Sequence, residues 1–270
     1  MIKIVSNNNV KNNQIISKEE MKKILDEKSP KIYEVIRVIE KKPIFMKEHF
    51  DRMNESIKLS GLKDFLSYND FKNSIQTLIN ENCLENNNIQ VSYYNEDQPV
   101  TLFYFIESHY PSKQEFNEGI HTVTMKIERT NPNIKSYQKD FKENIQKVMK
   151  DNSAFEVILM NNDGTISEGS RSNVFFVKGN KLFTSPDSLV LLGVTRSKVI
   201  QVCEENFIEV ERKISSYDKI KDYDAAFITG TSNDVLPIKT IDYIIFNSSE
   251  NEVVKKVSKL YLEEVKKEME

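Results

Sequence analysis

The sequence has few glycines, and three of them stand beside hydroxyl residues in a way that could bind a phosphate. Seven glycines occur in 270 residues. Three lie beside Ser or Thr in the segments 167–170 (SEGS), 192–196 (LGVTR) and 229–232 (TGTS). Backbone N–H groups at a helix start, with a Thr hydroxyl, form a phosphate site. Each segment alone is more often an ordinary helix cap. Two such segments, with an acidic residue in the third, indicate a ligand that carries a phosphate and a heterocycle.

The composition narrows the classes of protein that could hold such a ligand. A chain of 270 residues fits one large domain or two moderate ones, and 39% apolar with 29% charged residues is typical of a soluble globular protein. The net charge of −3 argues against a nucleic-acid binder. Cys83 and Cys203 are far apart, which indicates a reducing compartment, and the histidines at 49, 109 and 121 form no zinc motif.

The N-terminus shows no targeting signal. Residues 1–14 contain neither an apolar core nor a small-residue cleavage site. The most apolar run, 100–106, is far shorter than the roughly 20 residues that span a bilayer. We therefore expect a cytoplasmic protein with no membrane and no nucleic-acid partner.

The first half of the chain predicts strands and two amphipathic helices. Strands are expected at 32–39, 43–46, 89–94 and 100–106, and helices at 47–60 and 70–80. Gly61 stands where a C-terminal cap belongs. The polar stretch 107–119 contains Pro111 and no periodicity, so we interpret it as a linker between domains.

The second half continues the alternation of strands and helices. Strands are expected at 120–127, 155–160, 173–178, 181–184 and 225–229, and helices at 136–150, 195–206 and 252–267. Residues 162–164 (NDG) predict a hairpin turn, and Gly179-Asn180 a second one. This mixture fits two α+β or α/β domains.

Several motifs together resemble one enzyme family. Residues 156–200 contain an acidic strand, the run E-G-x-x-x-N-x-F and the run L-x-G-V-T-R. With NIKSY (133–137), HFDRM (49–53) and FITGTSND (227–234), they are similar to the fold-type IV pyridoxal-phosphate enzymes. That family holds branched-chain aminotransferases, D-amino-acid aminotransferases and aminodeoxychorismate lyases. The resemblance spans residues from about 30 to about 240, and it is densest in the second half.

The resemblance implies a fold and a cofactor. It implies an α/β (α+β) protein of two-domain fold-type IV architecture, with pyridoxal 5'-phosphate in the cleft between the domains. We expect a smaller N-terminal α/β domain at 1–112 and a larger C-terminal cofactor-binding domain of mixed α/β structure at 113–270.

The resemblance also assigns the chemistry of two residues. Lys135 matches the catalytic lysine, whose amine binds the cofactor aldehyde and then moves the substrate Cα proton. Glu168 matches the acid that pairs with the pyridine nitrogen and keeps the ring protonated. The separation of the two residues agrees with that in the family. Most lysines in so lysine-rich a chain are solvated surface charges, and the plain alternative for Glu168 is a surface glutamate.

Further cofactor contacts follow from the same motifs. Leu191 matches a residue that packs on the ring, although it could equally be core. Val194 and Thr195 open a helix and would bind the phosphate through backbone N–H groups, and Thr231 would add its hydroxyl. Arg52 matches the family arginine whose guanidinium binds phosphate oxygens. We interpret Arg196 as structural.

The chain departs from the family in its first domain. The glycine-rich turn F-G-D-G is replaced by residues 26–34, where only the pair Tyr33-Glu34 survives. The arginine and histidine that D-amino-acid aminotransferases use for the substrate carboxylate are missing, since 91–106 contains no arginine. Candidates for the substrate contact are Tyr33, Arg171 and Ser232, with Tyr93 and Tyr104 as further possibilities.

These residues favour an aminotransferase that acts on an amino acid and a 2-oxo acid. The segment 229–232 resembles the transaminase version of its loop. An aminodeoxychorismate lyase, which would form 4-aminobenzoate and pyruvate with the same Lys135, is the first alternative. A cofactor-binding protein without catalysis is the second, and the presence of both Lys135 and Glu168 argues against it. By analogy with the family, we expect a homodimer.

Overall fold

The computed structural model describes residues 3–63 and 65–270, and its contacts divide the chain into two units. Unit 1 comprises Met1–His109, Ile134–Tyr137 and Lys267–Glu270. Unit 2 comprises Tyr110–Asn133 and Gln138–Lys266. The short segment that carries Lys135 therefore belongs to unit 1, although the chain around it belongs to unit 2. The domains at 1–112 and 113–270 stay a prediction.

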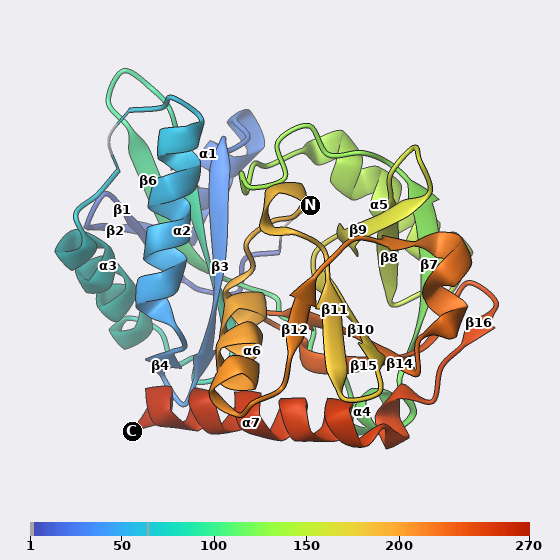
Figure 1. Ribbon diagram of the computed structural model, residues 1–270. Coiled ribbons are helices and arrows are strands. Elements are labelled where there is room, and N and C mark those ends of the chain that lie inside the picture. The colour runs from blue at the N-terminus through green and yellow to red at the C-terminus, as the bar shows by residue number, and fades with distance from the viewer. Residues whose placement is uncertain (1–2, 64) are drawn as a thin grey trace. The chain divides into compact units, whose positions relative to one another are not determined.

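Unit 1 is built on an antiparallel sheet with helices on both faces (Figure 1). Its described residues form β1 (Asn8–Lys11), β2 (Gln14–Ser17), α1 (Lys18–Glu27), β3 (Ile32–Ile39), β4 (Lys42–Pro43), α2 (Met46–Leu59), α3 (Tyr68–Asn80), β5 (Asn88–Tyr94) and β6 (Val100–Ile106). The strand order is β2-β1-β6-β5-β3-β4, and every neighbouring pair is antiparallel.

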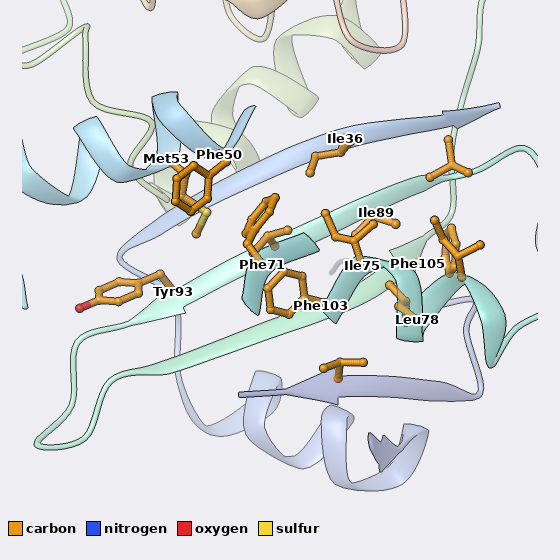
Figure 2. Packing of buried hydrophobic residues seen from close by; sticks show 14 of the residues in the cluster. Ile36, Phe50, Met53, Phe71, Ile75, Leu78, Ile89, Tyr93, Phe103 and Phe105 are labelled. Atoms are coloured by element: carbon orange, nitrogen blue, oxygen red, sulfur yellow. The ribbon is translucent and has the colours of Figure 1, made fainter. Parts of the chain in front are cut away.

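The alternation of side chains along β6 explains why both faces of this sheet are buried. Phe103 and Phe105 pack with α2 and α3, and Figure 2 shows residues of α3 pointing toward them. Leu102 and Tyr104 point to the other face and pack with Met21 of α1. Successive strand residues face opposite sides, so a strand covered on both sides is buried throughout. All seven residues of β5 are accordingly buried.

Most predicted elements of unit 1 are confirmed, and one prediction is wrong. The strand β3 has the predicted bounds, and α2, α3, β5 and β6 lie within two residues of theirs. Residues 43–46 are not a strand, because the tight turn at Glu40-Lys41 leaves a two-residue β4 and Met46 already begins α2. The elements β1, β2 and α1 were not predicted from the sequence. Ser17 caps α1 by accepting a hydrogen bond from the Glu20 N–H group.

Unit 2 contains a mixed sheet of ten strands among its described residues. Its elements are α4 (Lys113–Glu118), β7 (Ile120–Lys126), α5 (Lys139–Asp151), β8 (Glu156–Met160), β9 (Thr165–Gly169), β10 (Asn173–Lys178), β11 (Lys181–Thr184), α6 (Val194–Glu205), β12 (Val210–Arg212), β13 (Ser215–Ser216), β14 (Ala225–Gly230), β15 (Asp234–Ile241), β16 (Ile244–Ile245) and most of α7 (Glu252–Met269), with short 3₁₀ helices at Asp187–Leu189, Tyr217–Asp222 and Ser248–Glu250. The order is β12-β11-β10-β14-β15-β7-β8-β9-β13, and β16 pairs with β15. Strand β7 is parallel to both of its neighbours, and β11 is parallel to β12.

The predicted strands of unit 2 are confirmed. The boundary between the units, at His109 and Tyr110, lies within the predicted linker 107–119, but part of that linker is helical. Residues 113–118 form helix α4. Its start is stabilised by a capping box, in which the side chains of Ser112 and Glu115 each accept a hydrogen bond from the other residue's backbone N–H group. The S-x-x-E pattern of this capping box is present in the sequence, but the helix was not predicted because no long apolar stripe follows it. The helix expected at 136–150 begins only at Lys139, because Ser136 forms a β-bridge with Ile32 of unit 1. The described residues contain no helix that is long and apolar enough to cross a membrane.

The aromatic core of unit 1 should dominate its stability. Phe103 is fully buried, and its ring lies 5.5 Å from that of Phe71, centroid to centroid. We expect Phe103→Ala to lower the free energy of unfolding by about 3–5 kcal/mol, because truncation leaves a cavity. Denaturant unfolding measures this. Leu59→Ala on α2 is the control, since that side chain is 53% exposed. Equal effects of the two variants would contradict the packing described here.

Candidate active site

The segment around Lys135 is hydrogen-bonded to the first part of one edge of β3, which β4 does not cover. The Tyr33 N–H group donates to the carbonyl of Lys135 (3.2 Å), and the Tyr137 N–H group donates to the carbonyl of Lys31 (3.1 Å). The Lys135 N–H group donates to the Ser56 hydroxyl of α2 (3.3 Å). Strand β4 pairs only with Val38 and Ile39, so the first part of this edge is open to an irregular segment. The backbone at Lys135 is thus fixed by two elements.

The aromatic ring of Tyr33 lies beside the Lys135 side chain. Its Nζ lies 4.9 Å from the centroid of the Tyr33 ring, within the range of a cation–π interaction. The ring of Tyr137 meets Tyr33 edge-on at 5.9 Å. Of the residues considered for the substrate, Tyr33 is therefore the one that unit 1 brings beside Lys135. Tyr93 donates to the carbonyl of Lys63, and Tyr104 is buried against Gln90 and Ser92.

A buried ion pair stands next to this segment. Glu34 is fully buried and accepts hydrogen bonds from Arg52 Nε (2.8 Å) and Nη2 (2.6 Å), while His49 Nδ1 lies 2.8 Å from its carboxylate. Burial alone would raise the pKa of Glu34, but the charge of Arg52 and the hydrogen bonds from both partners hold that pKa well below its usual range. Burial also lowers the pKa of His49, so the imidazole is neutral and donates from Nδ1.

This ion pair bears on the predicted role of Arg52. Two of its three guanidinium nitrogens donate to Glu34, from one turn of α2 that also carries His49. The phosphate role of Arg52 stays a prediction, and the arginine would reach a phosphate from a position that Glu34 fixes.

In unit 2, Glu168 is buried and held by donors on both oxygens. Arg129 Nη1 donates to Oε1 (2.8 Å). The backbone N–H group of Leu191 (2.9 Å) and Asn173 Nδ2 (3.2 Å) donate to Oε2. Only 2% of the Glu168 residue surface is exposed. These donors come from three separate segments, so the direction of the carboxylate is fixed.

Residue 193 must be glycine because the Asn173 side chain lies too close to leave room for a Cβ atom. A Cβ atom at this position would lie 2.2 Å from Oδ1 of Asn173, the residue that holds Glu168. Asn173 also donates to the carbonyl of Leu191 (2.9 Å). Glycine at 193 thus lets the start of α6 come against the end of β10.

The start of α6 is suited to an anion. Its N-cap is Gly193, which has no side chain to accept hydrogen bonds from the first turn, whereas α1, α3 and α4 are capped by serines. Val194 and Thr195 open the helix and are buried. Asn173, which touches Gly193, pairs in the sheet with Thr229 of β14.

An orphaned hydroxyl supports the same interpretation. Among the described residues, Thr229 Oγ1 is one of a few buried side-chain polar atoms that have no hydrogen-bond partner. Thr229 directly precedes Gly230, and the Asn233 N–H group closes the turn that carries Thr231 and Ser232 onto the Gly230 carbonyl (3.0 Å). A buried orphaned hydroxyl, an uncapped helix start and a Thr-bearing turn fit a phosphate that supplies the missing partners.

Two arginines near these segments make local contacts. Arg171, a predicted substrate candidate, donates to the carbonyl of Phe155 (2.9 Å), and its side chain is 54% exposed. Arg196 is buried, donates to the carbonyl of Ser185 (2.8 Å) and pairs with Asp187 (2.8 Å). These contacts fit the structural role that was predicted for Arg196, which stays a prediction.

Sequence reasoning gave no role to four residues that shape these clusters. Glu34 and Asn173 belong to motifs given in the sequence analysis, so the motifs indicated these two residues but not their hydrogen-bond partners. His49 was quoted in the same way. Arg129 carried no signal, because it lies outside every motif and reaches Glu168 only through the fold.

Comparison with known proteins decides the family. A family model for amino-transferase class IV matches residues 31–241. A D-alanine aminotransferase from Bacillus licheniformis is 31% identical over 226 residues, which cover 78% of each chain. The chain belongs to the class IV aminotransferase family. Its members are PLP-dependent enzymes, so the predicted family, cofactor class and enzymatic nature are confirmed.

Solved structures confirm the predicted fold. A branched-chain aminotransferase from Thermoproteus uzoniensis, solved with norvaline, superposes with a TM-score of 0.84 at 20% identity, covering 98% of this chain and 96% of that one. A Legionella pneumophila protein described as a 4-amino-4-deoxychorismate lyase superposes with a TM-score of 0.76 at 21% identity, covering 87% and 91%. The chain therefore has the fold-type IV architecture, which transaminases and a lyase share.

The ion pair of Glu34 generates a pH-dependent prediction. Because its folded-state pKa is lowered, the pair stabilises the fold above the pKa of an unfolded glutamate, about 4.3, and this stabilisation is lost as the pH falls below that value. We expect Glu34→Gln to cost about 3 kcal/mol at pH 7, since Arg52 loses its buried partner. The difference from wild type should shrink between pH 4 and pH 2. Urea unfolding across this range measures it.

The matched control is Glu96→Gln, which removes a surface partner of Lys28. Exposed pairs contribute about 0–1 kcal/mol, so this variant should unfold nearly as wild type does at every pH. A pH-independent effect of Glu34→Gln would contradict the assignment of a charged Glu34.

Proposed function

We propose that the protein transfers an amino group between an amino acid and a 2-oxo acid, with pyridoxal 5'-phosphate bound by the residues described above. The observation that carries this proposal is Glu168, a buried carboxylate that Arg129, Asn173 and Leu191 hold in one direction. A carboxylate fixed in this way could keep a proton on a ring nitrogen, the task that the family resemblance gives to Glu168. Family membership supports amino-group transfer in general, and the residue roles are our proposal.

The cofactor, when bound, supplies an aldehyde and a pyridinium ring that accepts electrons from the substrate Cα. Lys135 would hold the aldehyde carbon and move the Cα proton through its amine. Glu168 would hold the proton at the ring nitrogen, and Leu191 would pack on the ring. Val194, Thr195 and Thr231, with Arg52, would bind the phosphate.

The substrate contact that we favour is Tyr33. Its ring lies against Lys135 Nζ, and a phenol can donate a hydrogen bond to a substrate carboxylate. Ser232, beside the proposed phosphate ligand Thr231, is a second candidate. Arg171 is less suited, since its guanidinium already donates to Phe155. We further propose that the protein acts as a homodimer in the cytoplasm.

A lyase remains the second candidate, because a protein described as a 4-amino-4-deoxychorismate lyase shares this fold. The segment TGTS at 229–232 resembles the transaminase version of its loop and supports transfer. A screen of amino donors against 2-oxo acids, with pyruvate release from aminodeoxychorismate measured beside it, separates the two. Transfer without pyruvate release is expected, and pyruvate release without transfer would replace our proposal with the lyase.

Covalent trapping tests the role of Lys135. We expect borohydride reduction of the cofactor-loaded protein, followed by peptide mass mapping, to find the cofactor on Lys135. Lys135→Ala should abolish the adduct, whereas Lys139→Ala, four residues away on α5, should not. An adduct on another lysine, or none after reconstitution, would refute the proposed function and would leave the non-catalytic alternative.

Substitution of the carboxylate tests the role of Glu168. Glu168→Gln keeps the shape of the side chain but removes the charge that holds the ring proton, so the carbanion-like transition state rises in energy. We expect a loss of about two decades or more in the half-reaction rate with the best amino donor, since each 1.36 kcal/mol costs tenfold. Bound cofactor should persist. A Gln variant with the wild-type rate would mean that Glu168 does not face the ring.

A further inference from the structure

Unit 2 contains a second buried carboxylate, Glu156, to which the proposed function gives no task. Glu156 begins β8 and is fully buried. Its Oε1 accepts hydrogen bonds from the Ser170 hydroxyl (2.5 Å) and the Val157 N–H group (2.8 Å). Its Oε2 accepts from the Ser172 hydroxyl (2.8 Å) and lies 3.8 Å from Nε of the half-exposed Arg171. A carboxylate this deep is costly to bury, so these donors must compensate for the lost hydration.

The donors to Glu156 belong to the turn that joins β9 to β10. This turn, residues 169–172, is closed by the Gly169 N–H group, which donates to the Ser172 carbonyl (2.8 Å). The Ser170 N–H group donates to the carbonyl of Val157 (2.8 Å). A Cβ atom at Gly169 would lie 2.0 Å from the Ser172 Oγ and 3.3 Å from Oε2 of Glu156. The backbone of the turn is therefore folded onto the carboxylate.

The same turn separates the two residues of the proposed ring-nitrogen site. Glu168 directly precedes it, and Asn173, which donates to Glu168 Oε2, directly follows it. A turn that shifted would move both partners of that hydrogen bond. The serine hydroxyls on either side of Arg171 thus tie Glu168 and Asn173 to β8 through one carboxylate.

We propose that Glu156 is a positioning residue, which fixes the 169–172 turn and through it the direction of the Glu168 carboxylate. This inference rests on the proposed function, because it gives Glu156 a task only if Glu168 serves a cofactor ring. Glu156 exchanges no proton with the cofactor or the substrate. It acts through Ser170 and Ser172, and the amide oxygen of a glutamine could replace most of its contacts.

The experiment compares variants that remove or preserve these contacts in the PLP-loaded protein. Glu156→Ala removes every contact, the double variant Ser170→Ala/Ser172→Ala removes the two hydroxyls, and Glu156→Gln preserves the acceptor for Val157 and Ser170. Ser167→Ala is the control, because that buried hydroxyl donates to the Leu159 carbonyl in the adjacent hairpin and does not touch Glu156. The readouts are the pH titration of the bound cofactor's absorbance, the Kd for PLP, the half-reaction rate and the thermal stability.

We expect the Ala variant and the double-serine variant to lose about tenfold to a hundredfold in the half-reaction rate, the scale of an ångström-sized misplacement. Their absorbance titrations should shift in the direction shown by Glu168→Gln, while the Kd for PLP changes less than about threefold. Glu156→Gln should recover most of the rate. If Glu156→Ala fails to fold, the double-serine variant decides by the same readouts.

The possible failures are distinguishable. If the wild-type protein forms no adduct on Lys135, the proposed function fails and this inference falls with it. If the wild type and Glu168→Gln behave as expected but the Glu156 and serine variants match Ser167→Ala, this inference alone is overturned. A loss of thermal stability with an unchanged titration and rate would also overturn it, because Glu156 would then be structural only.

Discussion

The cost of burying carboxylates is the constraint on which both candidate clusters depend. Glu34, Glu156 and Glu168 are each at least nine-tenths buried, and an uncompensated charge at such depth costs several kcal/mol. The chain compensates in three ways. Glu34 takes an arginine and a neutral histidine. Glu156 takes two hydroxyls, a backbone N–H group and a longer ion pair with Arg171. Glu168 takes an arginine, an amide and a backbone N–H group. The donors to Glu168 and Glu156 also fix irregular segments, namely those around Arg129 and Leu191 and the turn at 169–172.

Such contacts explain how irregular segments are held in place without a hydrophobic core of their own. The 134–137 segment is held to β3 by backbone hydrogen bonds, and the turn at 169–172 is folded onto the carboxylate of Glu156. The start of α6 approaches Asn173 because residue 193 is glycine. Side chains that must act with defined geometry are thus supported by strands, which are the rigid part of each unit.

Local patterns predicted the elements well where apolar periodicity was strong. The apolar residues at 32–39 and the apolar run 100–106 gave strands with the observed bounds, and the stripe of Phe71, Ile75 and Leu78 gave α3. Prediction failed where a short-range signal had no periodicity beside it, as at the capping box of α4, or where a distant strand intervened, as at the start of α5. A bridge from Ser136 to Ile32 cannot be seen in a local window.

The sequence by itself determined the family, the cofactor class and the fold, because motif residues with fixed spacing carry that information along the chain. It named Lys135 and Glu168 and the glycines around them. Only the tertiary structure decided which groups hold these residues, since Arg129 is 39 residues from Glu168 and Arg52 is 18 residues from Glu34. A buried charge takes its donors from whichever segments folding brings against it, and that proximity is a property of packing rather than of sequence separation.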